Sequence, residues 1–224
     1  TNFLRGFSSR SRGITAGRAR KRLAPFLFQT GDDMTLVMTS GPAVEPVSVA
    51  EAKAHLRIDG SAEDVLLASL VLTSRLHVEA ALSLALITQS WRLVLDRWPR
   101  RGKAELALGP VQSITSIKVK DAAGVLQTLP ATNYLVDIAS RPARVVLKDG
   151  ARIDPGIAAG GIEVDFVAGF GADASSVPAP LRHAILMLTA HWYEHRDPVE
   201  IGSSAARIPD AVSDLIQPFR TIRL

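Results

Sequence analysis

The amino-acid sequence predicts an α+β protein in which helices from the N- and C-terminal parts form a bundle and a small antiparallel β subdomain is inserted between them. Two patterns lead to this prediction. Apolar residues recur at three- and four-residue spacing near both ends of the chain, which is typical of helices. In the middle they alternate with polar residues, which is typical of strands that bury one face. The expected order of elements is therefore α-α-β-α-α.

The N-terminal helices are expected within residues 34–86. Ser48 and Glu51 have the spacing of a capping box, so a short helix should begin there and end near Leu56. A second helix is expected over 62–84, with acidic residues in its first turn, where the helix dipole favours them. This helix is apolar on several faces and must be covered on more than one side, which indicates contact between subunits. The candidate interface residues are Leu66, Leu70, Leu72 and Leu76.

The β subdomain is expected over residues 87–172. Trp91, Leu93 and Leu95 alternate with polar residues. The same alternation recurs over 104–106, 117–119, 134–136, 144–147 and 162–166. Residues 121–124 have the chemistry of a hairpin turn, because the glycine at their end readily adopts positive φ. Prolines separate the runs, as expected between short strands.

Residues 173–224 are expected to form the C-terminal helices and a docking tail. Pro178 and Pro180 suit the first turn of a helix, because the amide that proline lacks would have no partner there. Apolar residues over 181–192 then form one stripe. A polar break at 202–204 precedes a short terminal helix, whose apolar residues indicate docking on a partner. These residues are Leu215, Ile216, Phe219 and Ile222.

The net charge of +4 is concentrated in the first 33 residues. That segment contains seven basic and two acidic residues, which leaves 19 basic and 20 acidic residues in 34–224. One interpretation of residues 1–33 is a leader or an upstream extension, since Met34 looks like a natural start. An organellar presequence has a similar composition. Another interpretation is a basic arm that binds nucleic acid or an acidic partner. The residues of such an arm are Arg10, Arg12, Arg18, Arg20, Lys21 and Arg22.

Composition restricts the function classes. The chain has no cysteine, so disulfide frameworks and thiolate metal sites are excluded. No apolar run approaches the roughly 20 residues that span a bilayer. The first residues also lack the apolar core of a secretory signal. We therefore expect neither a membrane partner nor export.

One motif indicates catalysis. His191, Glu194 and His195 place two imidazoles four residues apart on one helical face with a carboxylate beside them, as in an inverted zinc-hydrolase motif. Glu200 is the nearest candidate for a third ligand. The motif has only three fixed positions and lies at a helix end, where a histidine interacts well with the helix dipole. A zinc-dependent hydrolase is therefore an alternative hypothesis, and the main expectation is no catalytic residue, no metal and no cofactor.

Other functional patterns are weak. The segment 169–171 lacks the context of a phosphate loop, and the sequence does not assemble a nucleophile, a base and an oxyanion hole. The body also lacks the basic stripe of a DNA-binding domain. A DNA-binding protein that acts through the arm 1–22 is the second alternative.

Seven segments follow one another along the body: 46–57 (PVSVAEAKAHLR), 86–91, 110–117, 133–137, 167–171, 178–194 and 208–220. In this order they resemble the head-tail connector (adaptor) proteins of tailed phages. The resemblance is to the longer form with a β insertion, found in prophages and phage-derived gene transfer agents. It covers residues 46–224, and residues 1–33 lie outside it.

The resemblance implies a non-enzymatic virion protein that forms a ring, typically of twelve subunits, between the portal protein and a tail terminator or stopper protein. DNA would pass through the ring during packaging and ejection without sequence-specific binding, which suits a nearly neutral body. The ring would lie at the head-tail junction of a virion or phage-like particle assembled in the bacterial cytoplasm. The C-terminal hook of such proteins grips the portal. Here the resemblance assigns that role to Ile208, Val212, Leu215, Ile216, Phe219, Arg220, Ile222 and Leu224.

Overall fold

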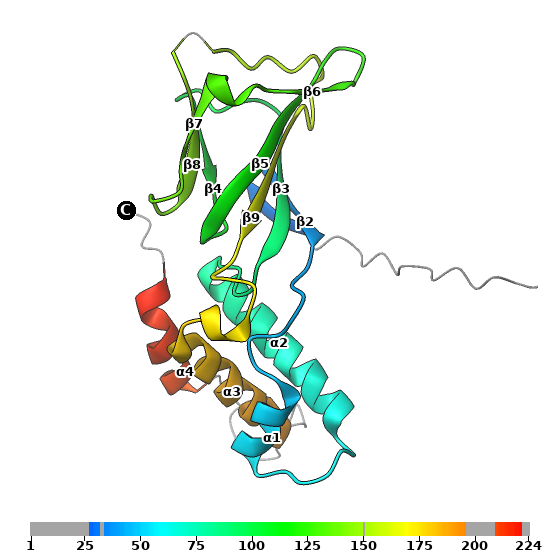
Figure 1. Ribbon diagram of the computed structural model, residues 1–224, viewed down its shortest axis with the longest axis vertical. Helices are drawn as coiled ribbons and strands as arrows, with labels where there is room; N and C mark the ends of the chain where they lie inside the picture. Colours follow the sequence, from blue (N-terminus) through cyan, green and yellow to red (C-terminus); the bar gives the residue numbers. More distant parts are fainter. Residues whose placement is uncertain (1–26, 32–33, 150, 196–208, 221–224) are drawn as a thin grey trace, which may run out of the picture.

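A computed structural model describes residues 27–31, 34–149, 151–195 and 209–220. The helices lie together at one end of an elongated molecule and the strands at the other (Figure 1). The helices come from two separate parts of the chain, and most strands of the antiparallel sheets lie between those parts in the sequence, although two strands precede the first helix. The α+β class predicted from the sequence is therefore confirmed.

Six antiparallel strands form the larger sheet, in the order β1-β2-β3-β9-β5-β6. Their bounds are β1 Leu27–Gly31, β2 Met34–Ser40, β3 Gln89–Leu95, β9 Ile162–Ala168, β5 Val111–Lys120 and β6 Leu126–Thr128. The alternating burial of β3 follows its sequence, since Trp91, Leu93 and Leu95 are buried and the residues between them are only partly covered. This matches the period of two that the sequence predicts for a half-buried strand.

A second sheet of three strands has the order β4-β8-β7. Its strands are β4 Lys103–Leu106, β8 Ala143–Leu147 and β7 Tyr134–Asp137, and a short 3-10 helix, η1 Ala131–Asn133, precedes β7. Leu106 and Val145 of this sheet belong to the same buried cluster as Leu93, Ile117 and Val164 of the larger sheet. The two sheets therefore enclose one apolar core between them.

Four α-helices share a second core. Their bounds are α1 Val49–Leu56, α2 Asp64–Leu82, α3 Ala179–Glu194 and α4 Asp210–Ile216, with the 3-10 helices η2 Ala174–Ser176 and η3 Gln217–Phe219. Helix α3 contacts each of the other three helices. Its buried residues Leu181, Ile185 and Leu188 recur at three- and four-residue spacing and pack with Val71 and Val78 of α2. The apolar stripe predicted over 181–192 is thus the face that α3 turns into this core.

Local signals in the sequence correspond to the structure at two places. The Ser48 hydroxyl accepts from the Glu51 amide at 3.2 Å, and the Glu51 carboxylate accepts from the Ser48 amide at 2.8 Å, which is the capping box expected at the start of α1. The hairpin turn before β6 closes with the Asp121 amide on the Val125 carbonyl. Gly124 has a φ of 78°, as that turn requires.

Two features differ from the sequence-based description. The sequence pattern places residues 34–40 with the N-terminal helices, but in the structure they form β2 and pair with β3 in the larger sheet. The β region is also built as two sheets around one core, a division that the sequence pattern does not predict. Both differences depend on pairing between distant segments, which periodicity alone does not specify.

Helix α2 is long and apolar enough to cross a membrane by length and composition alone. This corrects the expectation that no segment reaches that length, because the helix continues through Arg75 and Glu79. Both of these charged side chains are buried among protein groups, and α2 packs along α3. The core helix of a soluble protein passes the same test, so the finding is weak evidence for a membrane span.

Candidate interaction surfaces

Helix α2 exposes a face without charged residues. Val65 is 86% exposed and Leu72 is 40% exposed, although both are large and apolar. Between and beyond them, Ala68, Ser69 and Thr73 are also exposed. The residues proposed for subunit contact divide into two groups, because Leu72 lies on this exposed face while Leu66, Leu70 and Leu76 are half-buried. An exposed apolar helix face is typical of a surface that another protein covers.

Two charged residues of α2, Arg75 and Glu79, are buried inside the molecule. The Arg75 guanidinium donates to Glu79 at 2.6 Å and to Glu45 at 2.7 Å. The other Glu79 carboxylate oxygen accepts from the Leu86 amide at 2.8 Å and from the Gln89 side chain at 2.7 Å. Burial raises the pKa of Glu79, against the Arg75 charge and these hydrogen bonds, which lower it. This network joins α2 to the start of β3, and so holds the helices against the larger sheet.

The predicted C-terminal hook is partly used inside the chain. Val212 and Ile216 are buried in the helical core against α3, so they are not available to a partner, contrary to the sequence-based assignment. Leu215 and Phe219 are half-buried against the same core, and Arg220 is exposed. Ile208, Ile222 and Leu224 lie outside the described residues. An amphipathic helix indicates that one face will be buried, and here the chain itself covers that face.

The predicted basic arm also lies outside the described residues. This applies to Arg10, Arg12, Arg18, Arg20, Lys21 and Arg22. Its interpretation as a nucleic-acid or partner arm remains a prediction.

The histidine motif is at the end of α3, as expected. The His191 and His195 rings lie 4.7 Å apart between centroids, and His195 Nδ1 is 2.9 Å from the His191 carbonyl oxygen. Within the described part of the chain, no three His, Cys, Asp or Glu side chains form a group that could hold a metal ion. Glu200, the proposed third ligand, lies outside that part. The described geometry therefore gives a helix end in which His195 contacts the last turn.

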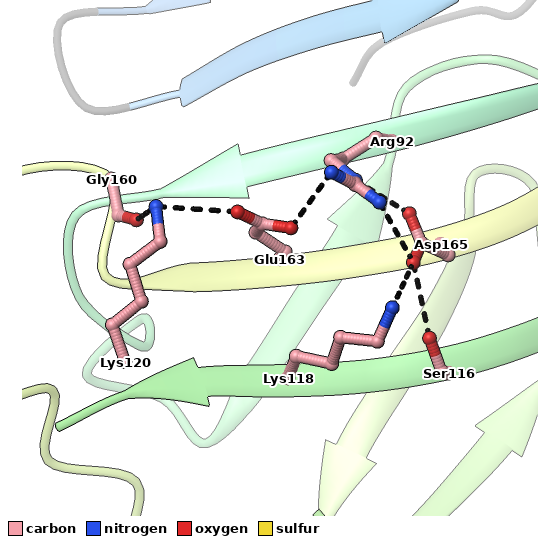
Figure 2. Close-up of polar contacts among 7 residues, drawn as sticks. All are labelled: Arg92, Ser116, Lys118, Lys120, Gly160, Glu163 and Asp165. Carbon is pink, nitrogen blue, oxygen red and sulfur yellow. Dashed lines mark hydrogen bonds and ion pairs between the residues drawn. The ribbon is translucent and has the colours of Figure 1, made fainter. Parts of the chain in front are cut away.

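One face of the larger sheet carries a network of paired charges (Figure 2). Arg92 on β3 binds Asp165 on β9 through two nitrogens, at 2.7 and 3.2 Å. Lys118 and Ser116 on β5 each reach the same carboxylate at 3.1 Å. Glu163 on β9 pairs with Arg92 at 2.9 Å and with Lys120 at 3.2 Å, and Lys120 also donates to the Gly160 carbonyl. The network ties three neighbouring strands together, and each of its three cations is paired with at least one of two protein carboxylates.

A large groove lies between the two sheets and the C-terminal segment. It has a volume of about 1410 Å³. Its walls are the end of α2 with the following turn, the segment 99–111 that contains β4, the loop 138–143, and the segment 218–220. We call it the basic groove, because its lining includes Arg100, Arg101, Lys103, Arg141 and Arg220. Only Arg220 among these cations is a candidate from the sequence, because the groove unites segments that are far apart in the chain.

The chain is similar to solved components of gene transfer agent particles. A chain from the neck of an empty particle, determined with C6 symmetry, has 31% identity and a TM-score of 0.70. A chain from the virion of a native particle has 31% identity and a TM-score of 0.69, and one from the neck of a native particle, determined with C12 symmetry, has 31% identity and a TM-score of 0.66. Each alignment covers 84% of this chain and 96% of the other. No protein-family model and no curated protein matches the chain.

The fold and these similarities define a structural component of a phage-like particle rather than an enzyme, as predicted from the sequence. The chain belongs to the family of that neck component of gene transfer agent particles. The resemblance of the sequence to head-tail proteins is thus confirmed at the level of a neck protein.

Proposed function

We propose that the protein is a head-tail adaptor of a tailed phage or a phage-like gene transfer agent. It forms a ring between the portal protein and the tail terminator or stopper protein, and DNA passes through the ring without sequence-specific binding. The observation that carries the proposal is the 31% identity over 96% of a chain from particle necks determined with C6 and C12 symmetry. Twelve copies per ring fit the higher of these symmetries. Assembly takes place in the bacterial cytoplasm, and the finished ring is part of the virion.

The exposed face of α2 is the proposed contact between subunits. In a closed ring each subunit uses two different surfaces, so this face contacts another part of its neighbour. Leu72 lies at the middle of the face and is 40% exposed in the single chain. Covering the 40% of this side chain that is exposed would contribute about 1 kcal/mol, and twelve repeats of one contact would add up around the ring. The three other candidate interface residues of α2 are half-buried: Leu66, Leu70 and Leu76.

The portal contact is proposed for the exposed part of the C-terminal segment. Leu215 and Phe219 are half-buried and Arg220 is exposed, so these three can reach a partner without unfolding the helical core. Deleting residues 208–224 is a poor test, because it would also remove Val212 and Ile216 from that core. Single substitutions at the exposed positions are needed instead.

The ring is tested by Leu72→Glu in the full chain, followed by electron microscopy of purified particles. We expect the neck ring to be lost while the isolated variant keeps its unfolding temperature, because the new charge lies on an exposed face. Leu126→Glu on β6 is the matched control, since Leu126 is 42% exposed. Loss of the ring with both variants would remove the assignment to α2. If particles produced with the unchanged protein do not contain it in their neck, the adaptor function itself is overturned.

A further inference from the structure

The basic groove has an unbalanced set of charges. Its lining contains the five cations named above and a single acidic residue, Glu105. Within the described residues, none of these six side chains makes an ion pair. Elsewhere the described cations are often paired, as in the network of Arg92, Lys118 and Lys120. Unpaired like charges around one hollow repel each other and attract an anionic ligand.

Apolar side chains line the same groove. Ile138 is 50% exposed, and Leu84, Phe170 and Phe219 also contribute to the lining. The phosphate groups of a nucleic acid cannot make apolar contacts with these side chains, so their binding would depend on the cations alone. A peptide with carboxylates and apolar side chains would use both features, since apolar anchors fill pockets while charges at the rim guide the approach.

We propose that the basic groove binds an acidic peptide segment of a neighbouring neck protein. Carboxylates of that segment pair with Arg100, Arg101 and Arg141, and its apolar side chains contact Ile138 and Phe219. The groove borders the exposed C-terminal segment at Arg220, so one partner can occupy both surfaces. The proposal extends the adaptor function by stating the chemistry of a partner, and it concerns a surface other than the exposed face of α2.

The test measures binding of labelled synthetic peptides to the full chain by fluorescence anisotropy. The first peptide combines aspartate and glutamate with leucine and phenylalanine. The second peptide keeps the acidic residues and has serine in place of the apolar ones. A short DNA duplex is the third probe. We expect the first peptide to bind most tightly. Arg101→Glu with Arg141→Glu should weaken its binding by at least about tenfold, because two attractive contacts become repulsive. Ile138→Ser should reduce its advantage over the second peptide.

The matched control is Lys148→Glu with Arg152→Glu. These two cations are exposed, make no ion pair within the described residues and do not line the groove. Both double variants change the net charge of the protein by the same amount. Equal weakening by both double variants would mean that net charge alone governs binding, which overturns the proposal. Tighter binding of DNA through the same arginines would assign the groove to nucleic acid and overturn it too, as would failure of the first peptide to bind. A change only in self-association would assign the groove to a second copy of the chain. The assay uses isolated protein, so its failure leaves the ring test with Leu72 unaffected.

Discussion

Arg75 and Glu79, one turn apart on α2, form a buried ion pair with 2.6 Å between Nη1 and Oε2. The pair lies where the helices meet the larger sheet, and Glu79 also accepts hydrogen bonds from Leu86 and Gln89. Removing two charges from water is costly, so such a pair stabilises a fold only when its remaining hydrogen bonds are satisfied. Here they are satisfied by groups from the segment that leads into β3.

The first prediction concerns this pair. Glu79→Ala leaves the Arg75 guanidinium buried with only Glu45 beside it, and should lower the free energy of unfolding by about 3 kcal/mol. Replacing both members, by Arg75→Met with Glu79→Leu, should restore part of that loss, because no buried charge is then left unpaired. Chemical denaturation measures both. Glu105→Ala is the control and should change stability by less than about 0.5 kcal/mol, since Glu105 is exposed and outside the described ion pairs. A Glu79→Ala protein as stable as the unchanged one would contradict the prediction.

The second prediction concerns acid. Burial alone would raise the pKa of Asp165, but hydrogen bonds from Arg92 and Lys118 and the Arg92 charge lower it below its ordinary value. Because the folded pKa is below the unfolded one, the stabilisation is present above pH about 4 and is lost as the pH falls through the folded pKa. Asp165→Asn should therefore be less stable than the unchanged protein at neutral pH and approach it in acid. Thermal unfolding across the pH range measures this convergence. Asp173→Asn, at an exposed position, is the control and should change the stability at neutral pH by less than about 0.5 kcal/mol.

The third prediction concerns Gly169, which leads out of β9. Its φ is 139°, and a Cβ there would lie 2.6 Å from the Ile87 carbonyl carbon and from the Thr88 amide nitrogen. Gly169→Ala should cost several kcal/mol or prevent folding, because backbone atoms would have to move. Gly124→Ala should cost only about 1 kcal/mol, since that glycine has positive φ but open space around it. Equal losses for the two variants in denaturation experiments would mean that the close approach at Gly169 is unimportant.

The fourth prediction separates docking from folding in the C-terminal segment. Phe219→Ala should weaken co-purification with the portal protein while changing stability little, because Phe219 is only half-buried. Ile216→Ala should instead lower the free energy of unfolding by about 2 kcal/mol or more, since Ile216 is 4% exposed in the helical core. Unchanged portal binding by Phe219→Ala would remove this residue from the proposed contact.

The features that could be predicted from the sequence are contained in short stretches. The capping box at Ser48 and Glu51 needs four consecutive residues, and the turn at 121–124 needs about as many. The apolar stripe of α3 needs only a regular spacing. In each case the physical cause is local, so the residues carry the whole signal.

The features that could not be predicted depend on what lies opposite a residue. Strand β2 alternates much as β3 does, with Met34, Leu36 and Met38 packed on the core, but its pairing with the distant strand β3 cannot be read from that alternation. The face of α4 that holds Val212 and Ile216 has the pattern of a docking helix whether its cover comes from the same chain or from a partner. The basic groove draws its cations from three distant segments, and none of them is unusual when considered alone.

Strand β9 lies between β3 and β5 in the larger sheet, although it is the last strand in the chain. During synthesis, the earlier strands of this sheet can therefore form only two unconnected parts, one containing β2 and β3 and the other β5 and β6. The sheet closes when residues 162–168 insert between them, a step that joins segments separated by long stretches of chain and so tends to be slow. Until that step, the edges of β3 and β5 that β9 will cover stay open to pairing with other chains. Insertion of β9 thus removes two inner edges along which a newly made subunit could pair with other chains.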